Sequence, residues 1–287
     1  FVFSQALLSE LTVVDDDNGN LPELLLHLKL DDTAGTDVTD SSGKTNRDGV
    51  LVNADASDLT VSGDETDIGA YTGWDFSKDA DAYIEISDAT ASDLSPEFDS
   101  RTVAFWYKLN NNSTKPLFYK GNKNSDGYRA YAQGTYTIFH ADSSGDGISS
   151  GKNYSGDSDY FSNWHHFAGV LDRTSSNLIL YIDGNPLAPQ NLSSGIAEAN
   201  TTNLSDLGNI DPSSPLYIGY NSTDGTYFDG LLDDFRIYGG ALTQTQITEL
   251  RQGTSLGIMT VTPVSYTHLR AHETPEHRVC PLLREKK

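Results

Sequence analysis

Three polar segments of the chain combine tyrosines with acidic or amide residues. They contain Asp126 and Tyr128, then Tyr154, Asp157 and Tyr160, and finally Tyr220, Asn221, Asp224 and Tyr227. Aromatic rings stack on the faces of sugars, while Asp and Asn oxygens accept hydrogen bonds from hydroxyl groups or coordinate a bridging Ca²⁺. Because loops carry binding sites more often than the strands beneath them, we predict that these residues bind a ligand. Solvated turns, which are rich in Asn, Asp and Ser, are the alternative interpretation.

Catalytic motifs are missing from the sequence. It contains no G-x-S-x-G elbow, H-E-x-x-H helix, phosphate-binding loop or dinucleotide fingerprint. His165 and His166 are adjacent on a predicted strand, so they point to opposite faces and cannot act together on one substrate. We expect one of them in the core and the other at the surface. The sequence therefore predicts no catalytic residues.

Composition favours a protein of strands and loops. The 287 residues are rich in Tyr, Gly, Ser, Thr, Asn and Asp. The formal net charge of −22 at pH 7 repels phosphate backbones and argues against nucleic acid as a partner, whereas cations, neutral glycans and basic surfaces remain compatible. Plain solubility in a salty medium explains the acidity equally well. No apolar run approaches the ~20 residues that a membrane-spanning helix needs.

The two ends of the chain differ from its middle. Residues 1–20 end in an Asp-rich run that lacks the EF-hand spacing, so we expect a linker or the end of a preceding domain, and a fragment without its true N-terminus. From about residue 265 the run beginning SYTHLRAHET resembles a translated sequencing adapter. We therefore interpret residues 259–287, including the sole cysteine Cys280, as a non-native or disordered tail of a metagenomic or transcript-derived fragment. One domain is predicted over residues 21–258.

Short apolar segments with a period of two recur between turns rich in Gly, Asn, Asp and Ser. They are typical of strands, and the clearest span residues 24–30, 101–109, 178–184 and 230–238. Residues 141–160 are predicted to form a long polar loop. Thr243 and Gln246 have the spacing of a capping box at the start of a short helix. We predict an all-β fold, a two-sheet antiparallel β-sandwich or jelly roll with one short C-terminal helix.

The strand at 230–238 lies at the centre of this prediction. Its alternation predicts Leu231, Phe235 and Ile237 on the core face and Leu232 on the opposite face together with Asp234, Arg236 and Tyr238.

Several of these segments carry a family resemblance. GLLDDFRIYGGALTQTQITE, residues 230–249, resembles a closing strand of the form G-x-I-D-E-V-R-I-Y followed by A-L-[ST]-x-x-[EQ]-I. FSNWHHFAGVLDR at 161–173 and LILYIDG at 178–184 resemble two further strands of the same family, and the matches run from about residue 24 to 252. The chain thus resembles the laminin-G-like members of the concanavalin A-like lectin/glucanase superfamily. Ser77 and Lys78 depart from the Asp-Gly turn of that family.

The resemblance implies both a metal and a function. Relatives hold a structural Ca²⁺ with an Asp that corresponds to Asp233, and we expect Asp31 and a backbone carbonyl near Gly43 to complete the site. The alternative is that Asp233 forms a cap, or pairs with Arg236 or a turn amide.

Glucanases of the superfamily carry E-x-D-x-x-E, but here Thr102 replaces the last acid after Glu97 and Asp99. The expected function is a non-catalytic, Ca²⁺-stabilised carbohydrate-binding or adhesion module of a larger extracellular or cell-surface protein, with a glycan or a cell-surface or matrix protein as partner. A structural spacer and an accessory domain of a glycan-degrading enzyme are the alternatives.

Overall fold

The computed structural model describes residues 21–66, 69–77, 79–122, 125–143, 146–157, 160–161, 163–187, 204 and 207–253. These residues all fall within one compact unit, residues 1–257. The predicted linker at 1–20 and the predicted tail at 259–287 lie outside the described residues.

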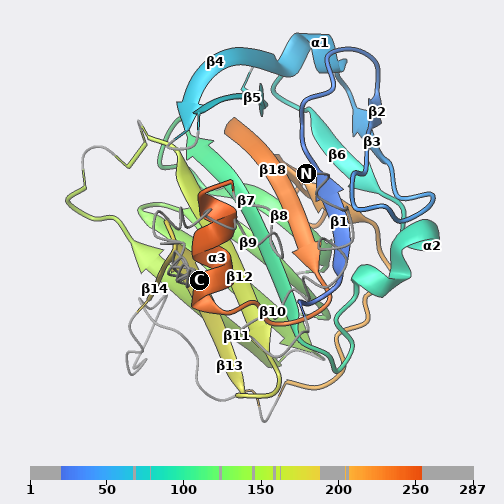
Figure 1. The fold of residues 1–287 in the computed structure, drawn as a ribbon, viewed down its shortest axis with the longest axis vertical. Helices are drawn as coiled ribbons and strands as arrows, with labels where there is room; N and C mark the ends of the chain where they lie inside the picture. Colours follow the sequence, from blue (N-terminus) through green and yellow to red (C-terminus); the bar gives the residue numbers. More distant parts are fainter. Residues whose placement is uncertain are drawn as a thin grey trace, which may run out of the picture. The chain divides into compact units, whose positions relative to one another are not determined.

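Two antiparallel sheets form the body of the domain, as the sequence predicts (Figure 1). The first sheet has the order β14 (Asn185–Pro186), β13 (Asn177–Ile182), β12 (His165–Asp172), β7 (Arg101–Leu109), β18 (Gly230–Tyr238), β5 (Gly69–Asp75) and β4 (Thr60–Thr66), with β1 (Leu24–Leu28) also paired to β18. The second has the order β11 (Asp146–Asn153), β10 (Tyr136–Ser143), β9 (Gly127–Gln133), β8 (Lys115–Gly121), β15 (Leu216–Ile218), β6 (Tyr83–Ile86), β3 (Gly49–Val52) and β2 (Asp37–Val38).

Smaller elements cover or connect the sheets. They are the hairpin of β16 (Tyr220–Asn221) and β17 (Thr226–Tyr227), the single-turn helices α1 (Ala56–Leu59) and α2 (Asp88–Ala91), the 3₁₀ turn Ser92–Leu94, and α3 (Gln244–Arg251). The predicted capping box starts α3, because Thr243 Oγ1 accepts from the Gln246 N–H and Gln246 Oε1 accepts from the Thr243 N–H. Within the described residues, no helix is long and apolar enough to cross a membrane.

The core lies between the two sheets and is rich in aromatic rings. Phe105 on β7 stacks on Phe167 of β12 at 4.6 Å and on Phe235 of β18 at 5.3 Å between ring centroids. Phe118, from β8 of the second sheet, meets Phe105 edge to face at 6.1 Å. Offset-stacked and edge-to-face contacts of this kind are favoured by the ring quadrupoles, so they fix how the two sheets sit on one another.

The predicted alternation of β18 is wrong in its first half. Leu232, and not Leu231, packs in the core with Phe235 and Ile237. The pairing with β7 shifts between Asp233 and Arg236, and Asp234 has a φ of +53°. This irregularity inserts an extra residue, so the alternation before it is displaced by one position.

The predicted loop at 141–160 is also wrong in its first part. β10 continues to Ser143, and β11 pairs with it along its whole length from Asp146 to Asn153. The sequence of β11, DGISSGKN, contains only one β-branched apolar residue, so it does not look like a strand. It forms one because it lies at the edge of its sheet and pairs with β10 through backbone groups.

His166 is the buried member of the histidine pair, as expected for one of the two. It is 3 % exposed and lies beside Trp106 on the face of the first sheet that α3 covers (Figure 1). Burial lowers its pKa from 6.5 to about 4, although the charges of Asp234 and Asp183 act in the opposite direction. The folded protein therefore holds a neutral imidazole where the unfolded chain binds a proton.

This burial predicts an acid sensitivity that can be measured. Between pH ~6.5 and ~4 the unfolded state takes up a proton at His166 and the folded state does not, so the stabilising contribution is lost as pH falls. We expect the melting temperature to drop by several degrees more in the wild type than in His166→Phe between pH 7 and 4.5. Equal drops in thermal melts of the two proteins would contradict the buried neutral histidine.

Candidate functional site

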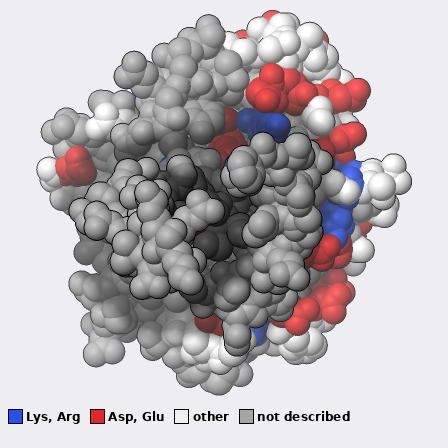
Figure 2. Space-filling view, viewed as in Figure 1, with Lys and Arg blue, Asp and Glu red and all other residues white. Residues whose placement is uncertain are grey.

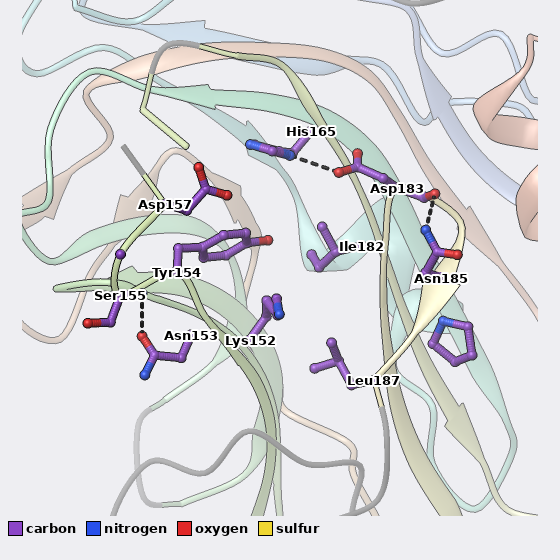
Figure 3. Close-up of a pocket in the computed structure, with 12 residues that line it drawn as sticks. Lys152, Asn153, Tyr154, Ser155, Asp157, His165, Ile182, Asp183, Asn185 and Leu187 are labelled. Atoms are coloured by element: carbon purple, nitrogen blue, oxygen red, sulfur yellow. Dashed lines mark hydrogen bonds and ion pairs between the residues drawn. The ribbon is translucent and has the colours of Figure 1, made fainter. Parts of the chain in front are cut away.

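An open pocket of about 830 Å³ lies where edge strands of the two sheets face each other. One wall comes from β11 and the residues after it, and the other from β12, β13 and β14 (Figure 3). The lining residues are Lys152, Asn153, Tyr154, Ser155, Gly156, Asp157, His165, Ile182, Asp183, Asn185, Pro186 and Leu187. Polar side chains outnumber the aliphatic ones in this lining, which suits a ligand rich in hydroxyl groups better than an apolar one.

Tyr154 forms the aromatic part of the pocket. Its ring stacks on Tyr160 with 3.5 Å between centroids and an interplanar angle of 8°, and the Lys152 ammonium lies 5.8 Å from the ring centroid. Figure 3 shows the Tyr154 ring extending from its own wall towards Ile182 on the opposite one. The stack holds the ring in one orientation, so little conformational entropy is lost when a ligand contacts it.

Buried hydroxyl groups support this stack from behind. Tyr107 Oη lies 3.1 Å from Thr137 Oγ1, which also hydrogen-bonds to Tyr160 Oη. Burial raises the pKa of Tyr107 and of Tyr160, so both hydroxyls stay protonated at neutral pH. Tyr160 is therefore held in place and in turn fixes the position of the Tyr154 ring stacked on it.

His165 and Asp183 form the polar centre of the opposite wall. His165 Nδ1 lies 2.9 Å from Asp183 Oδ2, and the His166 backbone N–H donates to Asp183 Oδ1 at 2.9 Å. Burial opposes the ionisation of Asp183, but these two hydrogen bonds outweigh it and hold its pKa below the usual value. Because a carboxylate only accepts, His165 Nδ1 donates, and Nε2 is a buried atom without a hydrogen-bond partner among the described residues.

A tight turn places these groups. Asp183 and Gly184 have φ values of +54° and +77°, which matches the Asp-Gly hairpin turn that the sequence predicts. Asn185 follows the turn, and its Nδ2 donates to the Asp183 backbone carbonyl at 3.1 Å (Figure 3). The turn therefore presents a carboxylate and an amide on the same side of the pocket.

Of the predicted ligand-binding residues, the structure brings the middle group together. Tyr154 and Asp157 line the pocket, and Tyr160 supports it from the core with 1 % exposure. Sequence reasoning missed Lys152, His165 and Asn185, and took Asp183 only as a turn residue. The one available signal was the clustering of the W-H-H strand and the D-G turn in consecutive paired strands, since β12 and β13 place them side by side.

The other predicted ligand-binding residues lie elsewhere. Tyr128 is in the core, where its hydroxyl donates to the Leu94 carbonyl, and Asp126 accepts from the Asp211 N–H. Tyr220, Asn221, Asp224 and Tyr227 share the β16–β17 hairpin, which contacts β8. Asn221 is buried there and donates to Asp224 Oδ2. Strands β9 and β10 separate β8 from β11, so this group is distinct from the pocket.

Asp233 is the most unusual of the predicted metal ligands. It is 1 % exposed, and its Oδ2 has no hydrogen-bond partner among the described residues. Burial, followed by the charges of Asp234 and Asp31, raises its pKa to about 8. A buried carboxylate with one oxygen left unpaired is costly to ionise, and a bound cation relieves that cost.

The remaining predicted metal ligands are exposed. Asp31 lies after β1 and is close enough for its charge to act on Asp233, while Gly43 lies in a turn with a φ of +83°. The described residues contain no group of three or more His, Cys, Asp or Glu arranged to hold a metal ion. A hard cation at Asp233 would therefore need backbone carbonyl oxygens as well, which Ca²⁺ accepts readily. Of the predicted alternative partners of Asp233, Arg236 is bound to Asp234 instead, whereas a backbone amide, the Asp234 N–H, does donate to the Asp233 carboxylate.

Comparison with known proteins agrees with the observed sandwich. Residues 78–248, more than half of the chain, match a laminin G family model described as the concanavalin A-like lectin/glucanases superfamily. The chain belongs to this superfamily. A search of curated proteins finds no match.

Solved structures with a similar fold include toxin binding domains. The receptor binding domain of botulinum neurotoxin D aligns with a TM-score of 0.58 and 16% identity over 80% of this chain and 52% of that chain. The binding domain of Paraclostridial Mosquitocidal Protein 1 aligns with a TM-score of 0.57 and 17% identity over 80% and 52%. The chain thus spans about half the length of these toxin domains, and the likeness concerns the fold.

A third solved structure is matched over its full length. Domain 4 of AbnA, a GH43 extracellular arabinanase from Geobacillus stearothermophilus in complex with arabinotriose, aligns with a TM-score of 0.54 and 20% identity over 81% of this chain and 100% of that chain. A similar fold therefore occurs as one domain of that arabinanase.

Proposed function

We propose that this superfamily member is a non-catalytic carbohydrate-binding or adhesion module of a larger extracellular or cell-surface protein. The observation that carries the proposal is the pocket that combines a fixed tyrosine ring with Asp157, Asp183 and Asn185. A sugar offers apolar C–H groups to the small accessible part of the Tyr154 ring, which is 6% exposed, and hydroxyl groups to carboxylates and amides, so both features of the pocket have a counterpart in one ligand.

Charge narrows the class of ligand. The chain has a formal net charge of −22, and in Figure 2 the charged side chains that are visible are mainly acidic. The residues that line the pocket include one ammonium group, Lys152, and two carboxylates, Asp157 and Asp183. A neutral glycan meets no net repulsion in this setting, whereas a polyanion does.

One alternative has a specific observation behind it. Domain 4 of the arabinanase is matched over its full length and was solved with arabinotriose, which supports an accessory domain of a glycan-degrading enzyme as the parent context. In that context too, we expect this chain to bind its glycan in the pocket. The other alternative, a spacer or protein-interaction domain, predicts a pocket that binds no sugar.

The pocket predicts a glycan affinity that depends on its exposed polar groups. We expect the full chain to bind neutral oligosaccharides in calorimetry, and the double variant Asp157→Ala/Asn185→Ala to bind them at least ~10-fold more weakly, since two hydrogen-bonding groups are lost. Both side chains are exposed, so the fold should remain intact. The matched control is Asp99→Ala/Asn112→Ala, which removes exposed groups outside the pocket.

Two outcomes would contradict this assignment. Equal affinity in the pocket variant and the wild type would remove the pocket from the binding site. Absence of binding across a panel of arabino-, xylo-, gluco- and manno-oligosaccharides would favour the spacer interpretation.

We further propose that Ca²⁺ stabilises the domain through Asp233. Chelation by EDTA should lower the melting temperature of the full chain by several degrees, and Ca²⁺ but not Mg²⁺ should restore it, because a ligand of the native state stabilises it by mass action. Asp233→Asn keeps the shape of the side chain without its charge and should abolish the response. The exposed control Asp99→Asn should keep it. A melting temperature of the wild type that does not change with EDTA would contradict the proposed Ca²⁺ site.

A further inference from the structure

Four tyrosines form a cluster on the outer face of the second sheet. We call Tyr83, Tyr217, Tyr220 and Tyr227 the tyrosine cluster. Each is partly exposed, and none belongs to a hydrophobic core cluster of the described residues. Tyr83 on β6 stacks on Tyr220 at 4.6 Å and 26°, and Tyr220 stacks on Tyr227 at 4.8 Å and 26°. Tyr217 of β15 meets Tyr220 edge to face at 5.5 Å.

Strand register places the cluster on one face. On β6 and β15 the intervening residues Ile84, Ile86 and Ile218 point into the core, so Tyr83 and Tyr217 point out. The β16–β17 hairpin then adds Tyr220 and Tyr227 beside them. The cluster is therefore assembled from three separate segments of the chain, and folding alone does not require aromatic residues at these partly exposed positions.

The same face continues across neighbouring strands. Glu85, Tyr217, Tyr119 and Arg129 are consecutive partners in one row that crosses β6, β15, β8 and β9. Only the Glu85 and Tyr217 end of this row is partly exposed, because Tyr119 and Arg129 are 6% and 4% exposed. Arg129 lies over the Tyr119 ring at 5.9 Å and is paired with Asp142, so its charge is already engaged.

The hydroxyl groups and carboxylates around the tyrosine cluster indicate which class of ligand it binds. Burial of the rings, and then the charge of Glu85, raise the pKa of Tyr83 and of Tyr217, so the hydroxyls remain protonated donors at neutral pH. Asp81 acts in the same direction on Tyr227. Flat rings edged by hydroxyls and carboxylates suit a neutral sugar chain, while the acidic surroundings disfavour a polyanion.

We propose that the tyrosine cluster is a second binding surface, which takes the interior of a linear neutral polysaccharide. Partly exposed rings on the outer face of a sheet can contact a chain that continues on both sides, whereas the pocket between β11 and β13 has two walls and suits a short oligosaccharide. The inference extends the proposed glycan function but rests on different residues. Two separated surfaces on one domain also raise the avidity for a long chain, because the second contact becomes intramolecular.

The test uses the full chain and polymer probes. Affinity electrophoresis through gels containing linear arabinan, xylan or mixed-linkage β-glucan measures retention, and calorimetry measures binding of the matching short oligosaccharides. The double variant Tyr220→Ala/Tyr227→Ala should lose at least ~10-fold in affinity for the polymer, since stacking and avidity are both removed. Its affinity for the short oligosaccharide should stay unchanged.

Two further variants control for structure. Phe98→Ala removes an aromatic ring that is 67% exposed and outside the cluster, and it should retain polymer binding. Tyr220→Phe/Tyr227→Phe keeps the rings, so its migration in the polymer-containing gel should be slowed almost as much as that of the wild type. If the Ala variant unfolds, as circular dichroism would show, Glu85→Ala provides a second probe, because it removes a carboxylate beside Tyr217 that accepts from sugar hydroxyls and should weaken polymer binding while leaving the core untouched.

The outcomes separate this inference from the proposed pocket. Full polymer retention by the Tyr220→Ala/Tyr227→Ala variant would overturn the second surface, even where the pocket variant has lost oligosaccharide binding. A change from dimer to monomer in size-exclusion chromatography of the Tyr variant, without loss of polymer binding, would assign the face to a second copy of the chain and overturn the glycan assignment. Failure of the wild type to bind any polymer would overturn the inference, and binding of short oligosaccharides in the same experiment would leave the pocket standing.

Discussion

The irregularity in β18 is the constraint on which the rest of the domain depends. This strand pairs with β1, β5 and β7, so it joins the N-terminal strand to the centre of the first sheet. At its middle, Asp234 adopts a φ of +53°, a conformation that residues other than glycine adopt rarely. His27 Nε2 lies 2.7 Å from Asp234 Oδ1, and Arg236 Nε donates to the same oxygen at 2.9 Å. These contacts clamp β1 onto β18 and hold the bulge in place.

The bulge determines which side chains of β18 lie on each face of the first sheet. It allows Leu232, Phe235 and Ile237 to enter the core, and it leaves Asp233 buried with one oxygen unpartnered among the described residues. Burial opposes the ionisation of Asp234, yet His27 and Arg236 hold its pKa below the usual value. Two adjacent carboxylates thus have opposite environments, one satisfied by protein partners and the other in need of a proton or a cation.

Sequence patterns predicted the β-sandwich well, but they predicted poorly which residues of different strands lie beside each other. The Thr243–Gln246 capping box and the Asp183–Gly184 turn are confirmed because they depend on residues close in the chain. The bulge at Asp233 and the edge strand β11 were missed, since the first changes the alternation without a glycine and the second forms through backbone pairing. The contact of His165 with Asp183, like the stacking of Tyr83 on Tyr220, depends on strand register, which a single sequence does not specify.

The most direct test of the account is a titration of the ¹⁵N-labelled full chain with neutral linear oligosaccharides, followed by backbone amide chemical shifts. Binding in the pocket predicts shifts that concentrate at Tyr154, Asp157 and Asn185, with smaller changes at His165 as its neighbours respond. Shifts concentrated at α3 or at the termini would place the ligand elsewhere. No shifts at millimolar sugar would contradict a carbohydrate-binding module.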